Sequence, residues 1–71
     1  MIVFKLNKKL YSKKAIEQAV LDYKEICEAR IENEKSNYKV ILNKKASDDE
    51  ISDDALKNEF CNYCLGMMKQ L

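Results

Sequence analysis

The sequence predicts a single α+β domain in which a three-stranded sheet carries two helices on one face. Two stretches repeat apolar residues at three- and four-residue spacing, which is typical of amphipathic helices, and three shorter stretches alternate apolar and polar residues, which is typical of half-buried strands. The stretches follow one another in the order β-α-β-β-α. The 71 residues contain no repeat or change of composition that would divide them, so we expect residues 1–71 to form one domain.

The first strand and the first helix are marked by a change of period and a capping residue. Residues 2–7 alternate between two faces, which predicts a strand. Ser12 then opens a helix, because its hydroxyl can accept a hydrogen bond from a free amide one turn further on. Leu21 faces away from the apolar stripe of this helix. The stripe itself consists of Ala15, Ile16, Ala19, Val20, Tyr23 and Cys27.

A hairpin and a second helix complete the chain. Around Cys27 the apolar period changes from 3.6 to 2, which predicts the start of a second strand. The polar stretch 33–37 has about the length that joins antiparallel neighbours, and alternation resumes from Tyr38. Ser52 caps the second helix, although a capping box at Ser47 also allows a start one turn earlier.

The order of the elements predicts the topology of the sheet. A helix that connects two strands of one sheet makes a right-handed crossover, which sets the first and second strands parallel and leaves the centre to the third, antiparallel strand. We therefore expect the order 1-3-2, a ferredoxin-like unit without its fourth strand. The helices should cover the face that carries Phe4, Leu6, Ala29, Ile31, Val40 and Leu42. The other face should keep Lys5, Glu28, Arg30, Glu32 and Lys39 in water.

The composition excludes several classes of partner and location. Lys and Arg number 13 against 12 Asp and Glu, the net charge is +1, and the lysines are scattered, so we expect no nucleic-acid binding. The sequence has no apolar run of the roughly 20 residues that a membrane span needs, and no secretory signal. These features predict a cytoplasmic protein without a membrane partner, whose three cysteines are reduced thiols.

The candidate catalytic groups have structural explanations. Cys61 and Cys64 form a Cys-x-x-Cys, but Cys61 lies more than two turns beyond the cap at Ser52, away from the helix end where thiols become reactive. A tetrahedral zinc site needs four ligands, and the chain has three cysteines and no histidine, so only a site shared across a dimer would complete it. The acidic residues at 48–50 and 53–54 lie where a helix would begin, and carboxylates are favoured there by the positive end of the helix dipole. We therefore expect the cysteines to contribute to packing, and we expect no cofactor and no enzyme activity.

Two surfaces are predicted to contact proteins. The first strand is an open edge of Ile2, Val3 and Phe4, with only Lys5 to discourage the pairing of another strand. The last helix has an apolar surface wider than one sheet can cover. Its stripe consists of Leu56, Phe60, Tyr63, Met67 and Leu71, with Cys64 beside it. Its flank consists of Cys61, Leu65 and Met68, which a monomer would leave in water.

The sequence resembles the HxsD family of His-Xaa-Ser systems. The resemblance is carried by Leu10-Tyr11-Ser12, by Ala19 in the first helix, by the alternating hairpin, and by Asn58-Glu59-Phe60-Cys61-Asn62-Tyr63-Cys64-Leu65. The chain departs from the family at Gly66-Met67-Met68-Lys69, where the last helix of the family tends to continue into an acidic, arginine-bearing end. The resemblance implies a small accessory protein that accompanies radical-SAM maturases, which modify a ribosomally made peptide.

Two functional hypotheses follow. In the first, the chain is a non-catalytic accessory module that binds a precursor peptide or a maturase, by strand addition at Ile2, Val3 and Phe4 or by docking on the flank. Glu59 and Asn62, polar neighbours on the last helix, would then fix the orientation of the partner. In the second, the chain is a structural homodimer that uses the same surfaces. A thiol-based metal or redox site is a third, weaker hypothesis.

Overall fold

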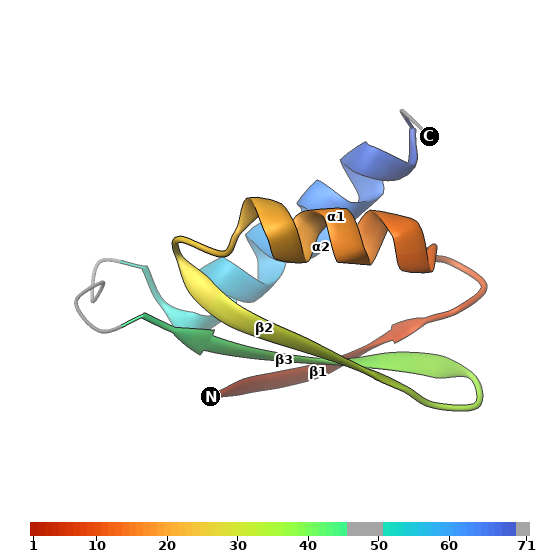
Figure 1. The fold of residues 1–71 in the computed structure, drawn as a ribbon, viewed down its shortest axis with the longest axis horizontal. Helices are drawn as coiled ribbons and strands as arrows, with labels where there is room; N and C mark the ends of the chain where they lie inside the picture. The colour runs from red at the N-terminus through yellow and green to blue at the C-terminus, as the bar shows by residue number, and fades with distance from the viewer. Residues whose placement is uncertain (46–50, 70–71) are drawn as a thin grey trace.

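The fold is an antiparallel sheet with both helices on one face. A computed structural model describes residues 1–45 and 51–69 of the chain. The elements are β1 (Ile2–Asn7), α1 (Lys13–Asp22), β2 (Cys27–Asn33), β3 (Asn37–Lys44) and α2 (Asp53–Met68). Figure 1 shows the twisted three-stranded layer below and the two helices above it. The predicted β-α-β-β-α order is confirmed.

The strand order in the sheet is β1-β3-β2, so the prediction of order 1-3-2 is also confirmed. The central strand β3 is antiparallel to both of its neighbours, which leaves β1 and β2 running in the same direction on either side of it. At the middle of the sheet Ile41 pairs with Val3 on one side and with Arg30 on the other. Both outer strands therefore have one edge that is unpaired within the described residues.

Two serines begin the two helices as predicted. The Oγ atom of Ser12 accepts a hydrogen bond from the amide of Ala15 at 3.1 Å, and that of Ser52 accepts one from the amide of Ala55, also at 3.1 Å. Each bond satisfies an amide that the helix itself cannot pair. The alternative start of the second helix at Ser47 lies outside the described residues.

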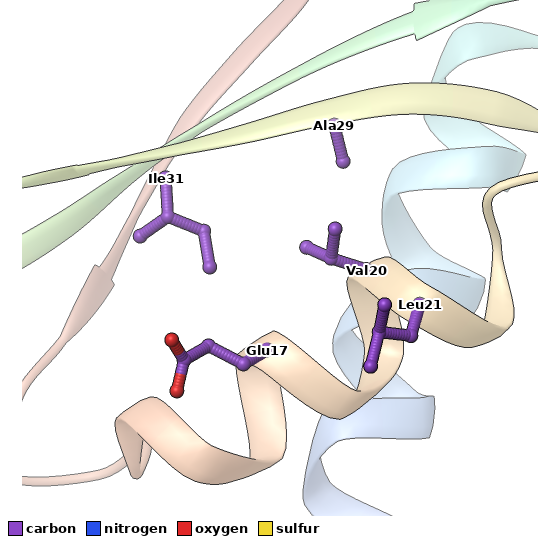
Figure 2. Close-up of a pocket in the computed structure, with 5 residues that line it drawn as sticks. All are labelled: Glu17, Val20, Leu21, Ala29 and Ile31. Atoms are coloured by element: carbon purple, nitrogen blue, oxygen red, sulfur yellow. The ribbon is translucent and has the colours of Figure 1, made fainter.

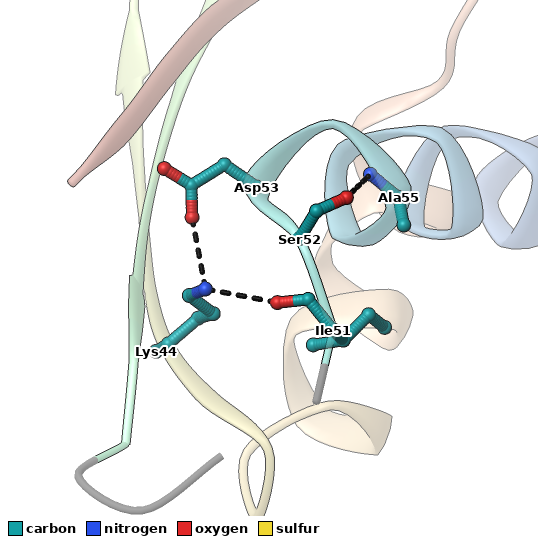
Figure 3. A network of polar contacts seen from close by, with 5 residues as sticks. All are labelled: Lys44, Ile51, Ser52, Asp53 and Ala55. Carbon is teal, nitrogen blue, oxygen red and sulfur yellow. Dashed lines mark hydrogen bonds and ion pairs between the residues drawn. The ribbon is translucent and has the colours of Figure 1, made fainter. Parts of the chain in front are cut away.

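Lys44 ties the end of β3 to the start of α2 (Figure 3). Its ammonium donates to the carbonyl oxygen of Ile51 at 2.9 Å and lies 3.0 Å from a carboxylate oxygen of Asp53. Asp53 stands in the first turn of α2, where a carboxylate also interacts favourably with the helix dipole. These contacts fix where α2 begins relative to the sheet.

The core lies between the helices and the sheet, and Phe60 is at its centre. The ring of Phe60 meets those of Phe4 and Tyr23 edge to face, with centroids 6.1 and 5.5 Å apart. The predicted buried face of the sheet is confirmed. The core consists of Ile2, Phe4, Leu6, Ile16, Ala19, Cys27, Val40, Leu42, Leu56, Phe60 and Cys64, with Ala29 and Ile31 partly buried against it.

The buried line of α2 differs from the predicted stripe at Tyr63 and Met67, which are only partly buried. Leu56, Phe60 and Cys64 are fully buried, whereas Tyr63 lies at the rim. The reason is that Tyr63 turns toward α1, where its hydroxyl donates a hydrogen bond to Asp22 and its ring packs against another aromatic side chain. The thiol of Cys64 takes the inner place instead. Leu71, also predicted in this stripe, lies outside the described residues.

One apolar residue is buried on the face that the helices leave uncovered. Ile41 is only 5% exposed there, although the alternation of β3 places it opposite the core. It is flanked in register by Val3 and Arg30. The aliphatic stem of an arginine can cover apolar surface while its charged end stays in water. The uncovered face is therefore not uniformly hydrated.

Candidate protein-binding site

Alternate residues of the β1 edge have free backbone groups. The amide of Lys8 donates to the carbonyl oxygen of Ser36, which makes this a hydrogen-bonded pair of the β1–β3 ladder. Bonded pairs alternate with non-bonded pairs in an antiparallel ladder, so Ile2, Phe4 and Leu6 also bond to β3. The intervening residues point their N–H and C=O groups away from the sheet. These residues are Val3, Lys5 and Asn7, but the carbonyl oxygen of Asn7 already accepts from the amides of Leu10 and Tyr11.

The predicted edge residues therefore divide into two kinds. Ile2 and Phe4 are 9% and 7% exposed, and their side chains and backbone groups are used inside the domain. Val3 is 46% exposed and has both its side chain and its backbone groups available to a partner. Among the three residues predicted at this edge, Val3 is the one that a pairing strand would contact most directly.

The predicted flank of α2 lies on the same side of the molecule as the β1 edge. Lys57, one turn before Cys61, holds its ammonium 5.7 Å from the ring centroid of Phe4 on β1. Residues four apart share a helix face, so Cys61 and Leu65 follow Lys57 along this side. Leu65 is 41% exposed, while Cys61 and Met68 are partly buried. The Lys57 contact thus places the start of this flank beside β1, and Leu65 lies about two turns further along α2.

Glu59 and Asn62 are both exposed, but Glu59 lies off this flank and Asn62 borders it beside Leu65. At 100° per residue Glu59 lies on the side of α2 that faces α1, about 120° around the helix from Leu65. Its carboxylate is close enough to α1 to act on Tyr23, whose pKa is raised by burial and by this negative charge. Asn62 lies on the solvent face between the two sides. The predicted orienting role would thus place these two residues at the margin of a partner's footprint.

The thiols are held in their protonated form. Burial raises the pKa of Cys64 to about 12, with a smaller contribution from Cys61, and burial raises the pKa values of Cys27 and Cys61 as well. A thiol with a raised pKa is a poor nucleophile and a poor metal ligand. Among the described residues no group of three or more His, Cys, Asp or Glu side chains is placed to hold a metal ion.

A cleft between α1 and β2 was not predicted from the sequence. Its volume is about 330 Å³, and Figure 2 shows the side chains that surround it. The lining residues are Glu17, Val20, Leu21, Ala29 and Ile31. Two features of the sequence could have indicated this cleft. Leu21 faces away from the apolar stripe of its helix, and a small residue, Ala29, occupies a core-facing position of β2.

The fold and these surfaces define a small α+β protein with open strand edges and exposed apolar side chains, features suited to protein contacts. No helix in the described part of the chain is long and apolar enough to cross a membrane. The family model of the His-Xaa-Ser system protein HxsD matches residues 6–67, and the chain belongs to the HxsD family. Membership indicates an accessory role in the His-Xaa-Ser system. Searches of curated proteins and of solved structures gave no match.

Proposed function

We propose that this chain is a non-catalytic accessory protein of the cytoplasm that binds another protein during radical-SAM modification of a ribosomally made peptide. The partner is either the maturase or the precursor peptide. The observation that supports the proposal is that the α2 flank begins beside β1, since the Lys57 ammonium lies over the ring of Phe4. Together they offer free backbone groups and exposed apolar side chains on one side of the domain.

Each half of this surface supplies a different kind of interaction. A strand added to β1 would bond to the outward N–H and C=O groups of Val3 and Lys5, which gives affinity with little sequence preference. The Leu65 side chain, 41% exposed, would add apolar contact beside the strand. Cys61 and Met68 have adaptable, sulfur-containing side chains that suit such a contact.

The test is recovery of the maturase and of the precursor peptide by the tagged full-length chain and its variants. Val3→Pro removes an outward N–H that the ladder does not use, so the sheet should form while strand addition is blocked. Leu65→Asp places a charge on the apolar flank. We expect at least a tenfold loss of recovery for one of these variants. Unchanged recovery of both partners with both variants would overturn the proposal.

Two controls separate binding from folding. Val3→Thr keeps the backbone N–H and should retain strand addition. Ile26→Asp places the same charge on a residue that is 39% exposed in the turn before β2, outside both the proposed surface and the α1–β2 cleft, and should leave recovery unchanged. Retained thermal unfolding transitions in all four variants would show that the domain is folded.

The alternative is a homodimer that uses the same surfaces, which the unpaired β1 edge would allow. Sedimentation of the chain alone at micromolar concentration distinguishes the two functions. A monomer supports the accessory role. A tight dimer that becomes monomeric in Val3→Pro would identify the surface as the contact between two copies.

A further inference from the structure

The cleft beside β2 exists because α1 packs more closely on α2 than on this edge of the sheet. In Figure 2 the side chains of Ala29 and Ile31 point from β2 toward α1, with Val20 and Leu21 below Ala29 and Glu17 below Ile31. The lining is apolar except for the one carboxylate, and Leu21 is 60% exposed. One end of the cleft is thus apolar and the other carries a negative charge.

The free backbone groups of β2 belong to the same residues that line the cleft. Glu34 donates to the carbonyl oxygen of Asn37, and Lys45 donates to that of Ile26, so even-numbered residues of β2 form the bonded pairs with β3. Odd-numbered residues therefore point their N–H and C=O groups away from β3, toward the open edge of the sheet. Ala29 and Ile31 are both odd-numbered, and both line the cleft.

This coincidence determines what can bind there. A strand that pairs with Ala29 and Ile31 must place the side chains opposite them on the same face of the sheet, because directly paired residues share a face. These two side chains are two residues apart in the added strand, and both point toward α1. One meets the apolar end of the cleft, and the other meets the carboxylate of Glu17.

We propose that β2 and the cleft form a second binding site, which takes an extended peptide segment carrying an apolar residue and, two positions away, a lysine or arginine. The apolar side chain lies opposite Ala29, and the cation lies opposite Ile31 beside Glu17. The proposal extends the protein-binding function proposed above but uses a different edge of the sheet. The two proposals can be tested independently, since this site does not involve β1 or the α2 flank.

Charge complementarity selects this occupant. Glu17 is the charged residue of the lining, and among the described residues it makes no ion pair. A purely apolar peptide would leave this carboxylate beside apolar surface, and an acidic peptide would be repelled by it. A volume of about 330 Å³ accommodates a branched aliphatic side chain together with the stem of a lysine.

The test is titration of the ¹⁵N-labelled full chain with acetylated heptapeptides that contain the proposed pair. The probes are Ser-Thr-Val-Thr-Lys-Thr-Ser and its reverse, because a strand can add in either direction. Thr-Glu in place of Thr-Lys gives the charge control, and lysine in place of valine gives the apolar control. We expect saturable amide shifts at Ala29 and Ile31 with at least one orientation of the Val-Lys pair, and binding at least fivefold weaker with either control.

Variants locate the site. Ile31→Pro removes an outward N–H that β3 does not use, and Ala29→Leu fills the cleft from a different position, so one of them remains informative if the other does not fold. Both should abolish the shifts. Glu17→Gln should weaken binding of the Val-Lys peptide about two- to fivefold, as expected for a partly exposed ion pair. Glu17→Lys should reverse the preference in favour of the glutamate peptide.

Three outcomes would overturn this assignment. The first is the absence of saturable shifts with both Val-Lys peptides. The second is a set of shifts centred on Val3 and Lys5, which would move peptide binding to the β1 edge. The third is concentration-dependent self-association of the chain alone that is lost in Ile31→Pro, which would show that the site is filled by a second copy.

Discussion

In each half of the helix-covered face one helix lies over one outer strand, but the space between helix and strand is filled in one half and open in the other. Over β1, α2 places Phe60 against Phe4, and this half is closed. Over β2, α1 faces Ala29 and Ile31, and a cleft remains. The difference lies in side-chain volume, because an aromatic pair fills the space between helix and sheet and an alanine does not.

This contrast shows how a small domain can use one half for stability and the other for binding. Its closed half must supply most of the stability, since a chain of 71 residues buries only enough core for roughly 3–5 kcal/mol. The open half contributes less burial and is therefore free to bind. Substitutions in the closed half should therefore change the free energy of unfolding more than substitutions in the open half.

The largest effect is expected in the closed half. Phe60→Ala removes a fully buried ring that two other aromatic rings contact, and such truncations cost about 3–5 kcal/mol. That cost matches the whole expected stability, so the variant should be unfolded by circular dichroism at 25 °C. Leu21→Ala in the cleft should change the free energy of unfolding by less than about 0.5 kcal/mol. Similar losses for the two variants would contradict the division.

The second effect is a loss of stability at alkaline pH. Cys64 has a folded-state pKa of about 12 against an ordinary value of 9.0, so its thiol is protonated in both states below pH 9. As the pH rises from about 9 toward 12, the unfolded chain releases this proton first, and folding becomes less favourable. The urea midpoint should fall across this window. Cys64→Ala should be less stable at pH 8 and should show a shallower decline.

The third effect concerns the start of α2. Ser52→Ala removes the hydroxyl that accepts the amide of Ala55 and should cost about 1 kcal/mol in urea unfolding. The matched variant Ser12→Ala removes the same bond from α1, which lies over the open half. Equal costs would show that the caps act locally. A much larger cost for Ser52→Ala would show that α2 holds the fold together more than α1 does.

The smallest effect is expected when the open half is filled. Ala29→Leu adds apolar volume to an existing cleft rather than to a packed core, so overpacking strain should not arise. We expect the free energy of unfolding to rise by up to about 1 kcal/mol, measured by urea denaturation, while peptide binding at β2 is lost. A loss of stability of more than 1 kcal/mol would mean that this half is already closed.

The sequence was sufficient to predict the elements and their topology because those depend on local signals. The alternation in residues 2–7, the caps at Ser12 and Ser52 and the change of period at Cys27 each act over a few residues. The handedness of the crossover then leaves one sheet order. All of these predictions are confirmed by the structure.

The features that the sequence did not predict depend on how the elements lie against one another. The α1–β2 cleft arises because α1 packs more closely on α2 than on β2, and the spacing of apolar residues does not predict this difference. The rim position of Tyr63 arises from its hydrogen bond to Asp22, 41 residues earlier in the chain. Helical spacing alone places Glu59 about 120° around α2 from Leu65, so the sequence already indicated that Glu59 lies off the flank.

The alternation of free backbone groups also governs any assembly through the edges. The outward groups of β1 belong to residues whose side chains lie on the uncovered face, whereas those of β2 belong to residues that face the helices. Two copies joined through their β1 edges in antiparallel pairing would form a continuous six-stranded sheet with all four helices on one side. Copies joined β1 to β2 in antiparallel pairing would be turned over at every junction, with helix pairs on alternate sides of a ribbon. The shape of an assembly would therefore reveal which edge had formed it.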